Sequence, residues 1–243
     1  MTKYSMKRLL LMTMLCCGLT AIAQNEKGTF SIKPLVGVNM TTLPGGLSDD
    51  YYHNKFGLTA GVEAEYGVNS WLGLSLGAIY SEQGAKIDGE LVAYAYDDQY
   101  AYWESTKSDG KVKCNYVNLP LMVSFYVPAI KGLALKAGVQ MGILVSSRTQ
   151  ADVDAVVDVY EKRDGMSFRL DGYPMPVQAT VDSKCDCKSL DFGIPIGFSY
   201  ESRHIVLDAR YYFGLTKIDD SPINREDVRN RCLSITLGYR LHL

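Results

Sequence analysis

Residues 114–147 decide the fold: they read CNYVNLPLMVSFYV, then PAIKG, then LALKAGVQMGILVSS. In both flanking runs every second residue is apolar, from Val117 to Val127 and from Leu133 to Val145. Because successive side chains of a β-strand point to opposite faces, each run predicts a strand with one unbroken apolar face. The PAIKG segment between them predicts a tight turn. Each strand is about a dozen residues long, and a tilted strand needs roughly 9–11 residues to cross a bilayer.

The first residues predict export. A positively charged start and an apolar run over residues 9–19 precede the small residues of Ala21-Ile22-Ala23. This is the pattern of a secretory signal peptide, with cleavage expected after Ala23. A lipoprotein signal ending at Cys16 or Cys17 is the alternative, which the bulky residues before Cys16 disfavour. We therefore expect residues 1–23 to be a signal peptide that directs the chain to the outer membrane of a Gram-negative bacterium.

The remaining composition fits one β domain over residues 24–243. A mature chain of about 220 residues is long enough for a single large domain of this class. The net charge of −2 gives no indication of nucleic-acid binding. No later stretch approaches 18 consecutive apolar residues, so no transmembrane helix is expected.

Eight segments share the alternation of an amphipathic strand, and the connections between them are alternately short and long. A soluble sandwich has no reason to keep this rhythm, whereas an outer-membrane barrel has short periplasmic turns and long outer loops. We predict an all-β fold, an eight-stranded antiparallel up-and-down transmembrane β-barrel. The expected strands are residues 29–41, 55–66, 71–81, 114–127, 133–147, 189–201, 204–216 and 231–243.

The second face of each segment carries glycine, polar and charged residues. The interior of an eight-stranded barrel is just wide enough for its own side chains, which suits this mixture, whereas glycine on a solvent face only weakens strands. We therefore expect the apolar face to contact lipid, although a soluble secreted lipocalin-like ligand-binding barrel is an alternative. Buried charges must be paired, which predicts a closed salt-bridged interior, with a proton or ion pathway as the alternative. The network is expected to comprise Lys33, Glu63, Glu65, Lys136, Asp191, Asp208, Arg210 and Arg240.

Aromatic residues on the apolar faces are expected to form two girdles, as membrane interfaces favour. The girdle near the periplasm would contain Phe30, Tyr66, Phe125, Tyr200 and Tyr239, and the outer one Phe56, Tyr80, Phe192, Tyr211 and Phe213.

The segment from Tyr116 to Val123, with its pattern of tyrosine, apolar, polar, apolar, proline and aliphatic residues, resembles the PorT-like outer-membrane β-barrel domain family. A Gly-Val-Asn sequence at residues 37–39 adds to the likeness, which covers nearly all of the mature chain. The family's name-giving member assists protein secretion across the outer membrane, so the resemblance implies a membrane barrel and leaves a secretion or assembly accessory as one role. The chain ends in Leu243 rather than in the terminal aromatic residue common in barrel proteins.

Four cysteines follow the signal peptide, and disulfides are expected in an oxidising compartment. Cys114 and Cys232 begin strands on opposite walls of the ring, too far apart for a direct bridge. The hypothesis from the sequence is that Cys185 and Cys187 bridge to both, holding the third long loop across the barrel mouth. A strained Cys185–Cys187 bridge and a metal site are alternatives, although no histidine lies near these cysteines in the sequence.

The second long loop has a run of alternating tyrosines that predicts a hairpin above the membrane. Such residues anchor interfaces, so a protein or glycan partner is expected there in addition to bilayer lipid, unless the rings simply pack the hairpin. The third loop has alternating valines at 153, 157 and 159 and a turn at 163–165. The candidate binding residues are Tyr94, Tyr96, Tyr100, Tyr102 and Trp103.

These features favour a non-enzymatic outer-membrane protein with a structural or surface-interaction role. The alternative is a barrel enzyme with its site at the mouth, where histidine would be expected near acidic or serine partners. Only His53 lies in an outer loop, beside Asp49 and Asp50, which is too little to predict a site. The sequence contains no cofactor motif, phosphate-binding loop or catalytic constellation, so no cofactor is expected.

Overall fold

A computed structural model describes residues 27–44, 52–163, 166–185, 187–218 and 228–243. The expected signal peptide lies outside the described residues, as do Asp49, Asp50, Asp164 and Gly165. Within the described ranges, no helix has the length and apolar character needed to cross a membrane.

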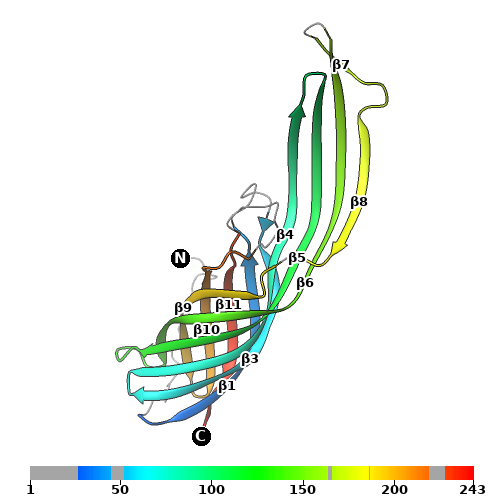
Figure 1. Ribbon diagram of the computed structural model, residues 1–243. Coiled ribbons are helices and arrows are strands. Elements are labelled where there is room, and N and C mark those ends of the chain that lie inside the picture. Colours follow the sequence, from blue (N-terminus) through cyan, green and yellow to red (C-terminus); the bar gives the residue numbers. More distant parts are fainter. Residues whose placement is uncertain (1–26, 45–51, 164–165, 186, 219–227) are drawn as a thin grey trace, which may run out of the picture.

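Eight antiparallel strands form a closed ring, as the alternation predicts (Figure 1). The ring closes where β11 pairs with β1, for example through Val36 opposite Leu237, and β12 continues this pairing at the end of the chain. The strands of the ring are β1 (Phe30–Thr42), β3 (Lys55–Asn69), β4 (Leu72–Tyr96), β5 (Tyr100–Tyr126), β6 (Leu133–Arg163), β9 (Leu190–Ser202), β10 (Ile205–Gly214) and β11 (Arg231–Tyr239), with β12 (Leu241–His242).

Burial alternates along the barrel strands in the direction that a membrane barrel requires. The apolar side chains are exposed, as for Val36 at 60% and Leu58 at 61%, while the polar ones are buried, as for Lys33 at 3% and Glu63 at 1%. The aromatic residues expected in the two girdles are on the exposed face or partly buried, and Phe30 pairs with Tyr66 near one end of the barrel. Lipid accepts such a face, whereas water would not favour it over eight strands.

Glycine makes room for the large side chains of the barrel interior. A Cβ atom on Gly238 would lie 2.9 Å from Cγ of Lys33, and one on Gly193 would lie 2.5 Å from the ring of Tyr212 and 2.3 Å from the carbonyl oxygen of Phe213. The inward glycines therefore determine where the long charged and aromatic residues can lie.

We expect Gly193→Ala to lower the stability of the barrel by about 1–3 kcal/mol, because overpacking displaces neighbouring atoms. Gly77→Ala is the matched control, since the nearest atoms to its Cβ would be side-chain atoms of Pro120, at 3.0 Å, and Ile79, at 3.5 Å, and no backbone atom is among them. Thermal loss of the compact band in unheated electrophoresis measures both variants. Equal melting temperatures for the two would contradict this packing argument.

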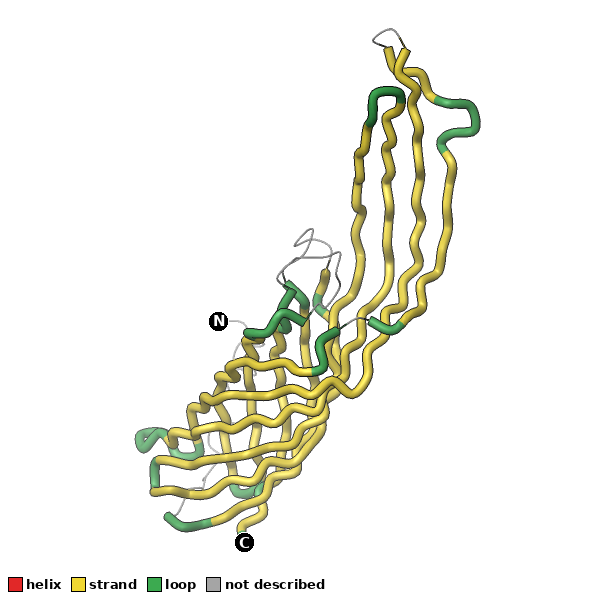
Figure 2. The backbone as a smooth tube through the Cα atoms, in the orientation of Figure 1, coloured by secondary structure: helices red, strands yellow, loops and turns green. Residues whose placement is uncertain are grey.

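Three of the barrel strands continue far beyond the ring. The β4–β5 hairpin is the hairpin above the membrane that the alternating tyrosines predict, whereas the sequence does not predict that it continues the barrel strands without a break or that the third long loop pairs with it. The expected strands end at Ser81 and Ser147 and begin at Cys114, whereas β4 reaches Tyr96, β5 begins at Tyr100 and β6 reaches Arg163. With β8 (Met175–Ser183) paired to β6, they form a four-stranded sheet in the order β4-β5-β6-β8. This projecting sheet rises from the end of the barrel opposite the C-terminus (Figures 1 and 2). The short strands β2 (Tyr52–His53) and β7 (Met166–Arg169) pair with β4 and β6.

The projecting sheet has two chemically different faces. The inner face continues the barrel interior and is mainly apolar, with Ile87, Val112, Val157 and Val177 as representatives. The outer face continues the lipid-facing surface and is mainly charged in its lower half. A β-bulge in β6, where Tyr116 pairs with Leu144 and Asn115 with Ser146, shifts the alternation by one residue. The bulge brings the odd-numbered valines of β6 to the inner face.

Candidate functional site

The centre of the barrel holds an ionic cluster around Glu63. One carboxylate oxygen of Glu63 accepts hydrogen bonds from Nζ of Lys33 at 2.8 Å and Nζ of Lys136 at 2.7 Å, and the other pairs with Arg210 at 2.5 Å. Asp208 lies 2.5 Å from Nε of Arg210 and 3.4 Å from Lys136. All five side chains are at least nine-tenths buried, so three cations share two carboxylates away from solvent.

A second cluster surrounds Arg240, near the C-terminal end of the barrel. Its guanidinium lies 3.0 Å from Glu65 and 2.8 Å from Glu201, and it donates to the hydroxyl of Tyr126 at 3.0 Å. Tyr126 in turn donates to Glu65. Together the two clusters contain four cations and four carboxylates, Glu201 included, and each charged group has an ion-pair partner within its own cluster.

Two of these residues were missed by the sequence reasoning, and one expected member lies elsewhere. Glu201 and Tyr126 have the inward parity of their strands, which would have identified them, but both stand at strand ends where the pattern was taken to stop. Asp191 was expected to pair with a cation. Instead its carboxylate accepts a hydrogen bond from the amide of Asn230 at 2.7 Å, and no ion pair joins it to a described residue.

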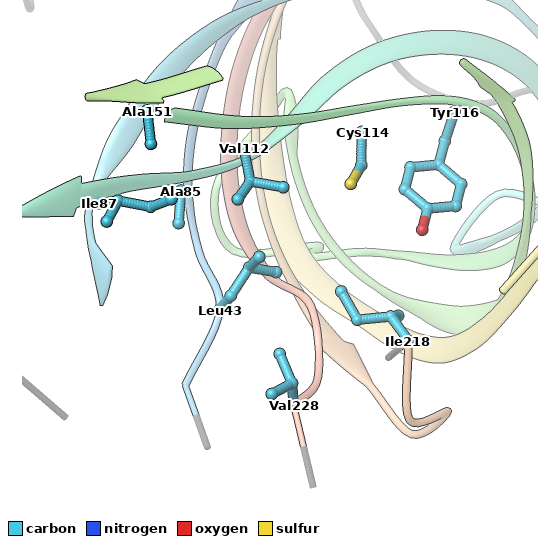
Figure 3. Close-up of a cluster of buried hydrophobic side chains, with 9 residues drawn as sticks. All are labelled: Leu43, Ala85, Ile87, Val112, Cys114, Tyr116, Ala151, Ile218 and Val228. Carbon is cyan, nitrogen blue, oxygen red and sulfur yellow. The ribbon is translucent and has the colours of Figure 1, made fainter. Parts of the chain in front are cut away.

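An apolar cluster lies at the outer end of the interior (Figure 3). Leu43, Ile218 and Val228, from the segments that follow β1 and β10 and precede β11, pack against side chains of β4, β5 and β6. Between this cluster and the ionic centre lies a cavity of about 40 Å³, whose lining includes Gln83 and Arg210. The strand residues of the cluster are Ala85, Ile87, Val112, Cys114, Tyr116 and Ala151.

The cysteines do not form the two bridges that the sequence suggested. All four are free thiols in the structure. Sγ of Cys187 lies 2.6 Å from that of Cys185 and 3.5 Å from that of Cys114, so three thiols meet beside the apolar cluster. Cys232 contacts the hydroxyl of Ser234 at 3.4 Å instead. The expected link from the Cys185–Cys187 pair to Cys232 is not formed in this structure, because the pair lies beside Cys114 of β5, on the opposite side of the ring from Cys232 of β11.

The five aromatic residues proposed as a binding surface are divided between the two faces of the projecting sheet. Directly opposed residues share a face, so Tyr94 and Trp103 lie together on the outer face. The Tyr94 and Tyr96 rings lie 5.7 Å apart, and Nζ of Lys162 lies 4.9 Å from the Tyr96 ring. Tyr100 and Tyr102 lie on the inner face, with their rings tilted and their centroids 6.2 Å apart.

The described histidines contact backbone and aromatic groups. His53 contacts the backbone oxygen of Asp88 at 3.0 Å, and the ring of His204 meets that of His242 edge-on, with centroids 6.0 Å apart. No group of three histidine, cysteine, aspartate or glutamate side chains in the described ranges is arranged to hold a metal ion.

The ring, its apolar exterior and its ion-paired interior define an integral β-barrel of the bacterial outer membrane. The family comparison agrees: residues 22–220 match the outer membrane protein beta-barrel domain family, and the chain belongs to this family. The match does not identify the PorT-like branch. No curated protein matches the chain.

Several solved structures are similar at low identity. The attachment invasion locus protein Ail of Yersinia pestis is 14% identical, with a TM-score of 0.39, over 88% of this chain and 99% of that one. Neisserial surface protein A is also 14% identical, with a TM-score of 0.37, over 86% and 96% of the two chains. OprG of Pseudomonas aeruginosa is 12% identical, with a TM-score of 0.41, over 90% and 99%.

Proposed function

We propose that this protein is a non-enzymatic outer-membrane anchor that displays the projecting sheet to bind a protein partner at the cell surface. The observation that carries the proposal is the free edge of β4. β2 pairs with β4 at Lys86 and Ile87. Beyond that contact, residues 88–96 of β4 pair with β5 on one side and with no described strand on the other. A free edge offers its backbone N–H and C=O groups to an added strand.

The composition of this edge favours an extended segment of a protein over a glycan. Residues 89–96 contain leucine, valine and two tyrosines, with neither proline nor lysine to block pairing. Tyr94 and Tyr96 stand along the edge with 63% and 70% of their surface exposed, and an added strand would cover them. The opposite edge, β8, carries Pro176, which lacks the N–H that a ladder needs.

The barrel itself supports an anchoring role. The balanced ionic clusters and the apolar cluster fill the interior at two levels, which fits a closed barrel better than an ion pathway. The secretion or assembly role that the PorT-like resemblance implies is a special case, in which the partner at β4 is an exported polypeptide.

Site-specific photocrosslinking in growing cells tests the strand-addition proposal. A photoreactive residue at position 94 on β4 is expected to give a discrete product with a second protein, whereas one at Thr180 on β8 is not. Ala93→Lys with Ala95→Lys should abolish the product, because edge lysines block strand pairing. Ala179→Lys is the control on the other edge. Equal crosslinking from both edges, or a product that survives the lysine pair, would contradict strand addition at β4.

We also propose that oxidation in the envelope joins Cys114 to Cys187 and leaves Cys185 and Cys232 as thiols. A Cys114–Cys187 bridge ties the segment before β9 to β5, whereas a bridge between residues 185 and 187 would be strained. Peptide mapping without reduction should recover the 114–187 cross-link and alkylated Cys232. A cross-link that contains Cys232 would contradict the proposal.

A further inference from the structure

Four lysines surround one pocket at the base of the projecting sheet. The pocket has a volume of about 410 Å³. It lies where β3 begins and β4 and β5 continue upward, and we call it the basic pocket. Its charged and aromatic lining consists of Lys55, Lys86, Lys111, Lys113, Glu82 and Phe56.

Like charges are placed opposite one another across neighbouring strands at this pocket. Lys86 is the direct partner of Lys111, and Lys113 is the direct partner of Arg148. Directly opposed like charges destabilise a sheet. Arg148 is neutralised by Asp182, at 2.6 Å.

The lysines themselves are not neutralised within the described part of the chain. Lys86, Lys111 and Lys113 form no ion pair with a described residue, and Nζ of Lys55 donates to the backbone oxygen of Gln83 at 3.1 Å. Four lysines face one lining carboxylate, Glu82, which gives an excess of 4 − 1 = 3 positive charges.

Charge is arranged in bands along the outer face of the sheet. Asp88, Asp109 and Asp152 are direct partners across three strands. They lie two residues farther from the barrel along their strands than Lys86 and Lys111 do. The basic band is thus the one nearer the membrane. Phe56, in the wall of the pocket, is 72% exposed and has the outward parity of β3. An exposed aromatic ring of this kind suits the interface between acyl chains and head groups.

We propose that the basic pocket binds the phosphate group of a phosphorylated lipid head group in the outer leaflet of the membrane. A phosphate carries a charge of about −1.5 to −2 and several acceptor oxygens, so one group offsets most of the excess charge and bonds several lysines at once. The ring of Phe56 lies beside it, at the level of the acyl chains. Lysines at a membrane surface attract anionic lipid in this way.

Lipid binding to the full chain, extracted in detergent and followed by native mass spectrometry, tests the proposal. The probes are bisphosphorylated lipid A, the same lipid after dephosphorylation, and inorganic phosphate. We expect retention of the phosphorylated lipid only. The triple variant Lys86→Gln, Lys111→Gln, Lys113→Gln should bind it on the order of 100-fold more weakly, since each lysine near such a surface contributes about a factor of five.

A matched triple variant controls for net charge. Lys107→Gln, Lys131→Gln and Lys162→Gln remove three exposed lysines away from the pocket and should leave lipid binding unchanged. If the two triple variants weaken lipid binding equally, the basic pocket is not the binding site. Equal binding of the dephosphorylated lipid would overturn phosphate recognition. If inorganic phosphate at equal concentration displaces the lipid, the pocket recognises free phosphate and the proposal of a lipid ligand is wrong.

Thermal unfolding provides a second test, in which the effect of Lys111→Gln on the unfolding temperature changes sign when the lipid is added. Without lipid, Lys111→Gln should raise the unfolding temperature, because it removes the repulsion by Lys86. With phosphorylated lipid A present, the same variant should unfold below the wild-type protein. A variant that is destabilised in both conditions would show a structural role for Lys111 and contradict the proposal.

Discussion

Glu63→Ala is expected to destabilise the barrel by about 3–5 kcal/mol, the cost of removing one partner from a buried ion pair. Glu63 accepts from Lys33, Lys136 and Arg210, and its side chain is 1% exposed. Its loss removes the carboxylate that pairs with Lys33 and leaves Lys136 and Arg210 paired with Asp208 alone within the cluster. Thermal unfolding followed by unheated electrophoresis gives the measurement.

The control for this prediction is Glu104→Ala on the projecting sheet. Glu104 is exposed, and its carboxylate accepts a hydrogen bond from Thr106 at 2.9 Å. Its removal should change stability by about 0.5 kcal/mol or less. If Glu63→Ala melts at the same temperature as Glu104→Ala, the ionic cluster contributes little to the stability of the barrel and the account of the interior is wrong.

Val36→Arg is expected to cost about 2–4 kcal/mol, because arginine on the lipid face near the middle of a bilayer must be desolvated or must deform the membrane. Val36 lies midway along β1 and is 60% exposed. Val92 on the projecting sheet is equally exposed, at 59%. A folding titration in lipid vesicles should show the loss for Val36→Arg and almost none for Val92→Arg. Similar values for the two variants would mean that Val36 does not face lipid.

Much of the barrel could be predicted because a membrane barrel uses strict alternation. Each strand must present one face to lipid and the other to a narrow interior, so a charged residue such as Lys33 or Arg210 reveals the inward face directly. Strand pairing then follows chain order around the ring, as between β1 and β3. This is why the sequence was sufficient for the fold and for most members of the ionic clusters.

The alternating tyrosines predict the β4–β5 hairpin above the membrane, but the rest of the projecting sheet could not be predicted in this way, because the environment outside the membrane does not require one continuous apolar face. The bulge in β6 after Leu144 reverses the parity of that strand, and charged rows replace the apolar face above it. The edge that we propose as a binding surface depends on β8 pairing with β6 rather than with β4. Loop sequence alone does not determine that choice.

Contacts across the barrel interior were also beyond the sequence, because they depend on the stagger between strands. Parity places Asp191 and Cys232 inside, but it does not say which residue each meets. Asp191 contacts Asn230 and not a cation, and Cys232 contacts Ser234 and not another cysteine. A shift of a few residues in stagger would change the partner of Asp191, whereas Ser234 is a neighbour of Cys232 on the same strand, β11.

Surface labelling of intact cells tests most directly whether the barrel displays the projecting sheet outside the cell. Asp98→Cys at the tip of the β4–β5 hairpin and Lys131→Cys in the β5–β6 turn would be compared in a chain whose four mature cysteines are serine. With a maleimide that does not cross the membrane, residue 98 should be labelled in intact cells, and residue 131 only after the outer membrane is permeabilised. Labelling of residue 131 but not 98 in intact cells would contradict the account.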